Sequence, residues 1–316
     1  MASATKNSSE DQISYSTALI NEHSQQRKTV AKTLSQKQLN KLSRTVSEMH
    51  PGKLQAELRK RNLSTSGILD IQRLRLKTYL KNELMGLFTD PLAMIEQPFD
   101  YIAVVDFEAT CEKDVPNYLH EIIEFPIVLV DVKQQTIVDQ FRSYCRPERN
   151  PVLSQFCRDL TGIQQHQVDT APTFAEVLHN VERWLNERNL STSASRNKLA
   201  FATDGPWDFA KFLQMQCRLS SLPYPEWANQ WVNVRKMFAR FYSMRSCGIV
   251  KMLEKLGLSF EGQQHSGLDD SNNIAHIVVQ LLKDGCILSL NDGIHEECSN
   301  DNKATDDNEI EIVFED

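Results

Sequence analysis

Two neighbouring acidic residues could hold a metal ion. Asp106 and Glu108 lie two positions apart at the end of the apolar run 101–105. The β-branched residues of this run predict a strand buried on both faces, and residues two apart in a strand point to the same face. Adjacent carboxylates repel each other and lose hydration on burial, and a hard divalent cation relieves both costs. Because such pairs are common at strand ends, a metal site requires further ligands elsewhere in the chain.

A third carboxylate follows about a hundred residues later. Asp208 comes soon after the apolar run 199–203, which is typical of another strand. Pro206 suits the first turn of a helix, so we expect Asp208 in the opening turn of a helix over residues 207–219. An acidic residue there could simply interact with the positive helix end. A metal role for Asp208 therefore depends on whether other candidate ligands lie near it in the fold.

The last candidate site residues lie close together in the sequence, in the segment 265–270. His265 precedes Asp270 by five positions, and Asp269 is placed to cap a helix that begins next to it. Asp270 would then lie in the first turn of that helix. Alone, His265 reads as an ordinary loop histidine. In combination with the four carboxylates, it is a candidate general base.

This combination resembles the DEDDh family of 3′-to-5′ exonucleases. It is most similar to the RNA-directed branch, the histone-mRNA 3′ exonucleases, which are also called enhanced-RNA-interference exonucleases. The resemblance covers about residues 100–290, and no departure occurs at the five family positions. It is carried by segments 106–112, 120–126, 160–163, 204–208 and 265–273. The resemblance implies a ribonuclease H-like fold and metal-dependent removal of nucleotides from RNA 3′ ends.

The mechanism we expect uses two Mg²⁺ ions, for which Mn²⁺ could substitute. Asp106 is assigned as the ligand shared by both ions, with Glu108 and Asp270 on the nucleophile side and Asp208 at the other ion. His265 takes the proton from the attacking water, because an imidazole titrates near neutral pH. Glu108 and His265 are therefore the predicted catalytic residues, and the products are nucleoside 5′-monophosphates.

Residues next to the ligands are candidates for holding the substrate. Besides Glu108 and His265, we expect the backbone of Ala109 and Thr110 to meet the terminal ribose, where contact with a 2′-hydroxyl would favour RNA. Trp207 could stack on the terminal base, an interaction worth roughly 1–3 kcal/mol. Packing of Trp207 in the core is an equally good reading of the sequence.

The charge of the chain is unevenly distributed. The 316 residues have a formal net charge of −7. Between residues 27 and 81, however, fourteen Lys and Arg residues stand against three acidic ones, whereas residues 291–316 hold ten carboxylates and one lysine. Attraction to phosphate depends on local positive charge, so the N-terminal segment is the candidate nucleic-acid contact.

Part of this basic segment is predicted to be a small folded unit. Leu54 and Leu58 have helical spacing, a turn with Gly67 follows, and helical spacing returns over residues 70–80. The pattern resembles a SAP domain, which implies nucleic-acid binding. Its basic residues could clamp phosphates or form a solvated face; they are Lys53, Arg59, Lys60, Arg61, Arg73, Arg75, Lys77 and Lys81.

The remaining pattern is that of an α/β domain with a mixed sheet flanked by helices. Predicted strands cover residues 101–106, 120–132, 135–144, 199–203 and 231–235, and predicted helices cover 174–187, 207–219, 249–255 and 270–283. The second and third strands are expected to form an antiparallel hairpin. The expected division of the chain is a disordered polar segment (1–39), the SAP-like unit (40–84), a linker (85–99), the exonuclease domain (100–290) and a disordered acidic tail (291–316).

Several classes of protein are excluded by composition. No apolar stretch approaches the roughly 20 residues of a membrane helix, and the polar N-terminus does not resemble a secretory signal. Seven irregularly spaced cysteines without a C-x-x-C pair predict reduced thiols rather than a disulfide framework or a zinc site. Reduced thiols are typical of the cytosol or nucleus. We expect a monomer in the cytoplasm and nucleus, with the nucleolus as one candidate location.

Alternative functions remain open from the residues alone. The first hypothesis is an exoribonuclease acting on a stem-loop or a duplex with a 3′ overhang. The family implies histone mRNA stem-loops, small interfering RNA overhangs and ribosomal RNA 3′ ends, with a stem-loop-binding protein and ribosomes as partners. A DNA 3′ exonuclease would use the same five residues. A non-catalytic RNA-binding adaptor is the third hypothesis, and the complete set of metal ligands argues against it.

Overall fold

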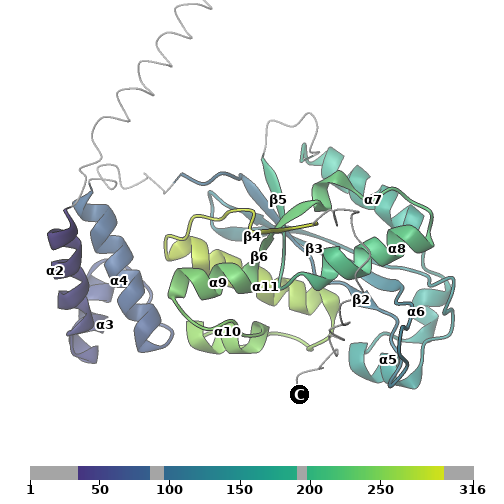
Figure 1. Cartoon of the computed structure of the whole chain (residues 1–316), viewed down its shortest axis with the longest axis horizontal. Coiled ribbons are helices and arrows are strands. Elements are labelled where there is room, and N and C mark those ends of the chain that lie inside the picture. Colours follow the sequence, from purple (N-terminus) through teal and green to yellow (C-terminus); the bar gives the residue numbers. More distant parts are fainter. Residues whose placement is uncertain (1–34, 86–95, 191–197, 295–316) are drawn as a thin grey trace, which may run out of the picture.

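A mixed β-sheet with helices on both faces forms the body of the protein (Figure 1). The computed structural model describes residues 35–85, 96–190 and 198–294. The predicted disorder of residues 1–34 and of the tail from 295 onward falls outside these ranges, as does most of the predicted linker. The α/β class predicted from the sequence is confirmed.

The sheet is built around its central strand, β1. This strand pairs antiparallel with β3 and parallel with β5; β5 pairs parallel with β6, and the predicted β3–β4 hairpin is confirmed. Short strands β2 and β7 add to β3 and β6. The strands are β1 (Tyr101–Val104), β2 (Glu108–Ala109), β3 (Ile122–Asp131), β4 (Thr136–Tyr144), β5 (Leu199–Thr203), β6 (Gln230–Asn233) and β7 (Asp292–Gly293).

Helices connect and cover these strands. The predicted helix over 174–187 is confirmed, whereas α5, α6 and α9 were not predicted. In order, the elements are α5 (Gln155–Thr161), α6 (Gln165–Asp169), α7 (Phe174–Glu187), the π-helix η1 (Asp208–Leu213), α8 (Gln214–Leu219), the 3₁₀ turn η2 (Glu226–Ala228), α9 (Val234–Tyr242), α10 (Ile249–Leu256) and α11 (Gly267–Lys283).

Two predicted boundaries were wrong for reasons of helix capping. The strand predicted over 231–235 ends at Asn233, because the side chain of Asn233 accepts from the backbone N–H of Lys236 and starts α9. Helix α11 begins three residues before Asp270, with Ser266 rather than Asp269 as its N-cap. The Asp269 carboxylate instead accepts from the backbone N–H of Gln263, in the loop before the helix.

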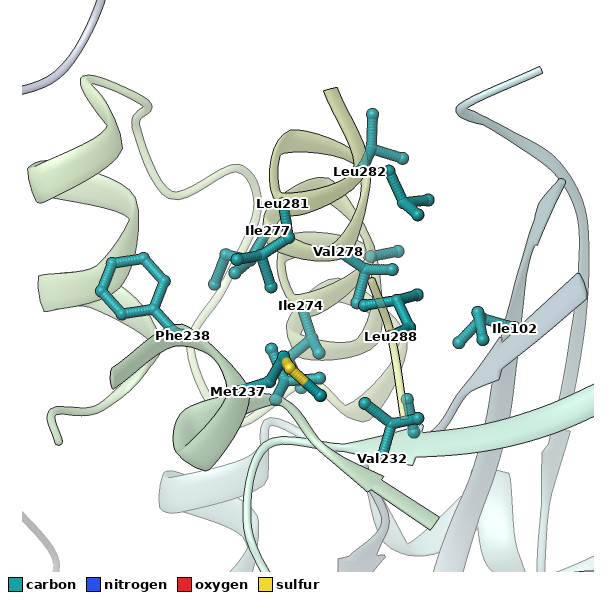
Figure 2. Packing of buried hydrophobic residues seen from close by; sticks show 14 of the residues in the cluster. Ile102, Val232, Met237, Phe238, Ile274, Ile277, Val278, Leu281, Leu282 and Leu288 are labelled. Carbon is teal, nitrogen blue, oxygen red and sulfur yellow. The ribbon is translucent and has the colours of Figure 1, made fainter. Parts of the chain in front are cut away.

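Alternate residues of β1 enter two different cores, which explains its continuous apolar run. Ile102 and Val104 face the core beneath α9, α10 and α11, and Ala103 and Val105 face the core beneath α7 and η1. Figure 2 shows the first of these cores, where Ile102 and residues of α11 gather with Met237 and Phe238 of α9 and Val232 of β6. The acidic residues that follow β1 are thereby held at the end of a strand fixed on both faces.

Three helices precede this body, namely α2 (Gln36–Ser47), α3 (Pro51–Lys60) and α4 (Leu69–Leu84). They share a small core of Val46, Leu54, Leu58 and Leu76. The predicted limit of disorder at residue 39 was too late, because Ser35 and Gln38 form a capping box that starts α2 at Gln36. The predicted disorder from residue 291 begins too early, because β7 pairs with β6 and Asp292 accepts from Asn233 and Lys236.

The N-terminal helices pack directly on the sheet-containing body. The backbone N–H of Ile68 donates to the carbonyl of Lys255 over 2.9 Å, and Ile71 joins the core beneath α11. A Cβ on Gly67 would lie 2.7 Å from the same Lys255 carbonyl, and Gly67 has a φ of +90°. Close backbone contact at this joint therefore requires glycine.

One predicted phosphate ligand is buried in this contact. Arg75 is 2% exposed and donates to both carboxylate oxygens of Asp284 over 2.6 and 2.9 Å, so its assignment to RNA binding was wrong. The sequence shows a basic helix but not which side of it packs against α11. Of the other predicted basic residues, Lys53, Arg59, Lys60 and Lys81 are exposed, while Arg61, Arg73 and Lys77 are half-buried and contact Glu57, Asp70 and Ser47, respectively.

Two further features of the described residues concern membrane-spanning helices and disulfide bonds. None of their helices combines the length and apolar character needed to cross a membrane. The described cysteines are free thiols; Cys247 is half-buried and the others are buried, as expected of core residues. Cys298 lies outside the described residues.

Candidate active site

Three of the predicted ligands meet at the end of the central strand. Asp106 follows β1, Glu108 begins β2, and Asp270 lies in the first turn of α11. One carboxylate oxygen of each lies within 4.8 Å of the other two. Residues separated by more than 160 positions in the chain thus present their oxygens to one point, as a metal centre requires.

Gly267, the first residue of α11, allows this approach. A Cβ at Gly267 would lie 2.6 Å from the carbonyl oxygen of Asp106 and 3.3 Å from the Glu124 carboxylate. The backbone N–H of Gly267 donates to that same carboxylate over 3.2 Å. The start of α11 therefore rests against the end of β1, and Asp270 follows within the same turn.

Asp208 comes from a different element and lies beside this group of three oxygens, without belonging to it. It is the first residue of η1, and its Oδ1 accepts from the backbone N–H of Phe107 over 2.8 Å. This bond fixes Asp208 beside Asp106, the residue before Phe107. The Phe107 side chain points to the opposite core, where its ring lies 4.6 Å from that of Phe125. A π-helical turn at this place agrees with the frequent use of such turns at functional sites.

His265 lies at the exposed rim of the site. Its φ of 62° places it in the left-handed region, and its backbone N–H donates to the Asp270 carboxylate. Asn273 holds the loop before it, since its side chain accepts from the backbone N–H of Glu261 and donates to the Glu261 carbonyl. The loop conformation is thus set by buried hydrogen bonds, while the imidazole remains accessible to a substrate.

The electrostatics of the cluster call for a positive charge. Burial, followed by repulsion from Asp208 and Asp270, raises the pKa of Asp106 well above its usual value. Burial and then Asp270 raise the pKa of Glu108, and burial raises the pKa of both Asp208 and Asp270 to about 7. An all-oxygen donor set with this much mutual repulsion fits a hard divalent cation, which would let all four carboxylates ionise.

Two further carboxylates, Glu121 and Glu124, are hydrogen-bonded structural groups. Glu121 accepts from the backbone N–H groups of Glu148, Arg149 and Asn150. Glu124 is fully buried; it accepts from Arg142 over 2.7 Å as well as from Gly267. Its link to the start of α11 could not be found in the sequence, because Glu124 and Gly267 are 143 positions apart.

The predicted substrate contacts lie next to the metal ligands in the chain, at Ala109 and Thr110 after Glu108 and at Trp207 before Asp208. Thr110 is buried, and its Oγ1 accepts from the backbone N–H of Glu121 over 2.9 Å. Ala109 lies in β2 between Glu108 and Thr110. Trp207 is 37% exposed, so of its two readings the one as a core residue was wrong. The ammonium of Lys211 lies 4.6 Å from the centre of the Trp207 ring, a contact that the sequence reading missed although the spacing of four residues on a helix indicates it.

Comparison with known proteins agrees with this site. Residues 103–278 match a family model described as exonuclease (RNase_T). The chain belongs to this exonuclease family. It is 44% identical over 253 residues to a protein of Rattus norvegicus named 3′-5′ exoribonuclease 1, covering 79% of this chain and 72% of the relative.

Solved structures extend the comparison to the fold. One is the nuclease domain of 3′hExo, described as a DEDDh family member bound to rAMP; it is 47% identical with a TM-score of 0.61 and covers 63% of this chain and 100% of that one. Another, titled as 3′-end specific recognition of histone mRNA stem-loop by 3′-exonuclease, is 46% identical with a TM-score of 0.61 and covers 63% and 89%. The predicted DEDDh resemblance and ribonuclease H-like fold are confirmed.

Proposed function

We infer that this chain is a metal-dependent 3′-to-5′ exoribonuclease. The observation that supports this most strongly is the convergence of the Asp106, Glu108 and Asp270 oxygens within 4.8 Å, with Asp208 fixed next to Asp106. A relative named 3′-5′ exoribonuclease 1 is 44% identical to this chain, and two solved structures titled as 3′-exonucleases share its fold at 46% and 40% identity. A site of this kind hydrolyses phosphodiester bonds.

The site residues have two roles: the carboxylates would hold cations, and His265 moves a proton. Asp106, Glu108 and Asp270 would hold one Mg²⁺, and Asp106 with Asp208 a second, with Mn²⁺ able to replace either. When bound, the cations would activate the attacking water and neutralise charge on the phosphate. Burial lowers the pKa of His265, which favours the neutral imidazole that can take the proton from the attacking water. The products are nucleoside 5′-monophosphates.

The preferred substrate is an RNA with a structured region near its 3′ end. The backbone of Ala109 and Thr110 meets the terminal ribose, and Trp207 stacks on the terminal base. Exposed Lys53, Arg59 and Lys60 of the N-terminal helices contact phosphates of the stem, as in the SAP-like reading of this unit. Histone mRNA stem-loops, overhangs of small interfering RNA and ribosomal RNA 3′ ends are the candidate substrates.

The candidate substrates define partners and places in the cell. A stem-loop-binding protein and the ribosome are the proposed partners, and cytoplasm and nucleus, including the nucleolus, the proposed locations. No membrane contact belongs to this function. The locations are tested by recovering the protein with RNA from separated nuclear and cytoplasmic fractions. If the protein is absent from one fraction, that compartment is not one of its locations.

The choice between RNA and DNA is decided by matched substrates. Ribo- and deoxyribo-oligomers of one sequence are digested with Mg²⁺, and the release of mononucleotides is followed over time. We expect the ribo-oligomer to be trimmed faster; a preference for the deoxy strand would make the protein a DNA exonuclease. Binding without trimming of either strand would leave an RNA-binding adaptor.

The stem contact is tested without removing the N-terminal helices, since their loss would uncover Ile71 and leave Asp284 buried without Arg75. We expect the double variant Lys53→Gln, Lys60→Gln to lose affinity for a hairpin RNA while trimming a short single strand normally. The matched control is Lys133→Gln, an exposed residue in the β3–β4 turn. Equal hairpin affinity of the double variant and the wild type would remove the N-terminal surface from the proposal.

A further inference from the structure

A hollow on the surface of η1 and α8 has no assigned role. Its volume is about 320 Å³, and it is lined by Leu119, Ala210, Lys211, Gln214, Met215, Arg218 and Leu219. It contains two cationic side chains and no acidic one. Among the described residues, neither Lys211 nor Arg218 forms an ion pair. Its charge is therefore available to an anionic ligand, in a protein whose net charge is negative.

The hollow is continuous with the active site through one helical face. Trp207, Lys211, Gln214 and Arg218 recur at helical spacing on the solvent side of η1 and α8, whereas Asp208 and Phe209 point inward. At about 1.5 Å per residue, Arg218 lies roughly 10 Å beyond Lys211 along the helix. A stacked strand rises about 3.4 Å per nucleotide, so this face spans about three nucleotides.

Lys211 links the hollow to the residues proposed to meet the terminal nucleotide. Its ammonium lies 4.6 Å from the centre of the Trp207 ring and 5.9 Å from that of Phe212. The Phe212 ring in turn contacts His120, whose Nδ1 lies 2.8 Å from the carbonyl of Thr110. A continuous series of contacts thus runs from Thr110, beside the metal ligands, to the cationic hollow.

The opposite side of the hollow is formed by the segment before β3. Leu119 is 49% exposed there and precedes His120. An exposed leucine opposite a lysine and an arginine gives an apolar surface for a base and cations for the phosphates on either side of it. Such a combination suits a single-stranded nucleic acid better than a peptide, which has no regular row of negative charges.

Resting on the exoribonuclease function above, we propose that this hollow is the subsite for the RNA strand upstream of the terminal nucleotide. Lys211 holds the phosphodiester next to the terminal base, and Arg218 holds one about three nucleotides further from the 3′ end. Leu119 lies against a base between them. The subsite gives affinity for strands long enough to reach it, without selecting sequence, because phosphates carry no base information.

Binding measurements test the subsite independently of hydrolysis. Fluorescence anisotropy with a 5′-labelled single strand of about ten nucleotides, in EDTA, compares the wild type with Lys211→Gln, Arg218→Gln and the double variant. We expect the double variant to bind at least about tenfold more weakly. The slope of log affinity against log salt should become shallower by about 1.4, for two lost phosphate contacts on a single strand. Lys133→Gln is the matched control of charge, and its affinity and slope should equal those of the wild type.

Varying the length of the RNA strand distinguishes a loss of this subsite from a general loss of positive charge. The effect of Arg218→Gln should be large on about ten nucleotides and small on a dinucleotide, which ends before Arg218. Unchanged affinity of the double variant for the long strand would overturn the proposal, as would equal losses for both lengths. A loss confined to a hairpin RNA would assign the cations to the complementary strand and would also overturn it. A wild type that binds the strand in this way but releases no nucleotide with Mg²⁺ would refute the exoribonuclease function and leave the strand-binding site standing.

Discussion

Arg75 of α4 and Asp284 at the end of α11 form an ion pair in which each side chain is 2% exposed. Tyr242 and Gln280 also donate to the Asp284 carboxylate, over 2.8 and 2.7 Å. The pair joins the N-terminal helices to the body that holds the site. The basic surface of α3 and α4 is therefore presented in a fixed position rather than on a free arm.

Breaking this pair should destabilise the protein strongly. We expect Arg75→Ala to lower the free energy of unfolding by about 3–5 kcal/mol, because it leaves the Asp284 carboxylate buried without its cation. The control is Arg73→Ala on the same helix, whose partner Asp70 is exposed and whose loss should cost less than about 1 kcal/mol. Urea unfolding measures both, and similar values for the two variants would contradict the rigid attachment.

Gly267→Ala tests the approach of α11 to β1. The added Cβ meets the Asp106 carbonyl at 2.6 Å, so the helix must retreat and take Asp270 with it. We expect kcat on RNA to fall by about 100-fold, since displacements near 1 Å have effects of this size. The stability should fall by about 1–3 kcal/mol.

The control for this substitution is Gly52→Ala in α3, where a Cβ would lie 3.6 Å from its nearest neighbour. Its kcat should match that of the wild type. Full activity of Gly267→Ala would mean that the start of α11 can move without disturbing the carboxylates.

The loop that holds His265 depends on Asn273. Asn273→Ala leaves the N–H and carbonyl of Glu261 without their partner, which costs about 1–3 kcal/mol of stability. We expect kcat to fall more than KM rises, because the main role of His265 is to take the proton from the attacking water. The neighbour Asn272→Ala, which loses a bond to the Leu268 carbonyl within the helix, should have a normal kcat. An equal effect of the two substitutions on kcat would argue against a positioning role for Asn273.

Without metal, the stability of the protein should depend on pH in an unusual direction. Burial raises the pKa of Asp208 and Asp270 from 3.8 to about 7, so the folded protein binds these protons more tightly than the unfolded chain. The resulting stability is present below about pH 4 and is lost as the pH rises through about 7. In EDTA, the Tm should therefore fall between about pH 5 and pH 8.

Added Mg²⁺ should raise the Tm more at about pH 8 than at about pH 5, where protons compete for the same carboxylates. Asp270→Asn should reduce the fall in EDTA, because one of the titrating groups is gone. Thermal melts of both proteins at the two pH values measure this. A Tm in EDTA that rises toward pH 8 would show that the carboxylates are not mutually destabilising.

Local signals in the sequence were sufficient for much of this fold. The buried run before Asp106, the strand at 199–203 and the helix at 174–187 follow from hydrophobic spacing and β-branched residues. The four carboxylates were predicted together because the resemblance connected segments that no periodicity relates. Short helices such as α5 and α9 were missed, since their few turns give little periodic signal.

Contacts between distant segments were beyond the reach of sequence reasoning. In the sequence Arg75 cannot be distinguished from its basic neighbours, and only the packing of α4 shows that it binds Asp284. Asp269 has the sequence position of an N-cap, but in the fold its carboxylate accepts from the backbone N–H of Gln263. Glu124 and Gly267 meet only because β3 and α11 pack together. In each case the partner that decides the role is fixed by tertiary packing and not by neighbours in the chain.

The most direct test of the metal-dependent exonuclease site is digestion of a 5′-labelled RNA by the wild type and by Asp106→Asn, with Mg²⁺ and with EDTA. The wild type with Mg²⁺ should shorten the RNA stepwise from its 3′ end and release nucleoside 5′-monophosphates. Asp106→Asn, which removes a ligand charge and keeps the side-chain shape, should be slower by at least about 1,000-fold, or about 4 kcal/mol in the barrier. Equal rates of the two proteins, or full wild-type activity in EDTA, would contradict the account.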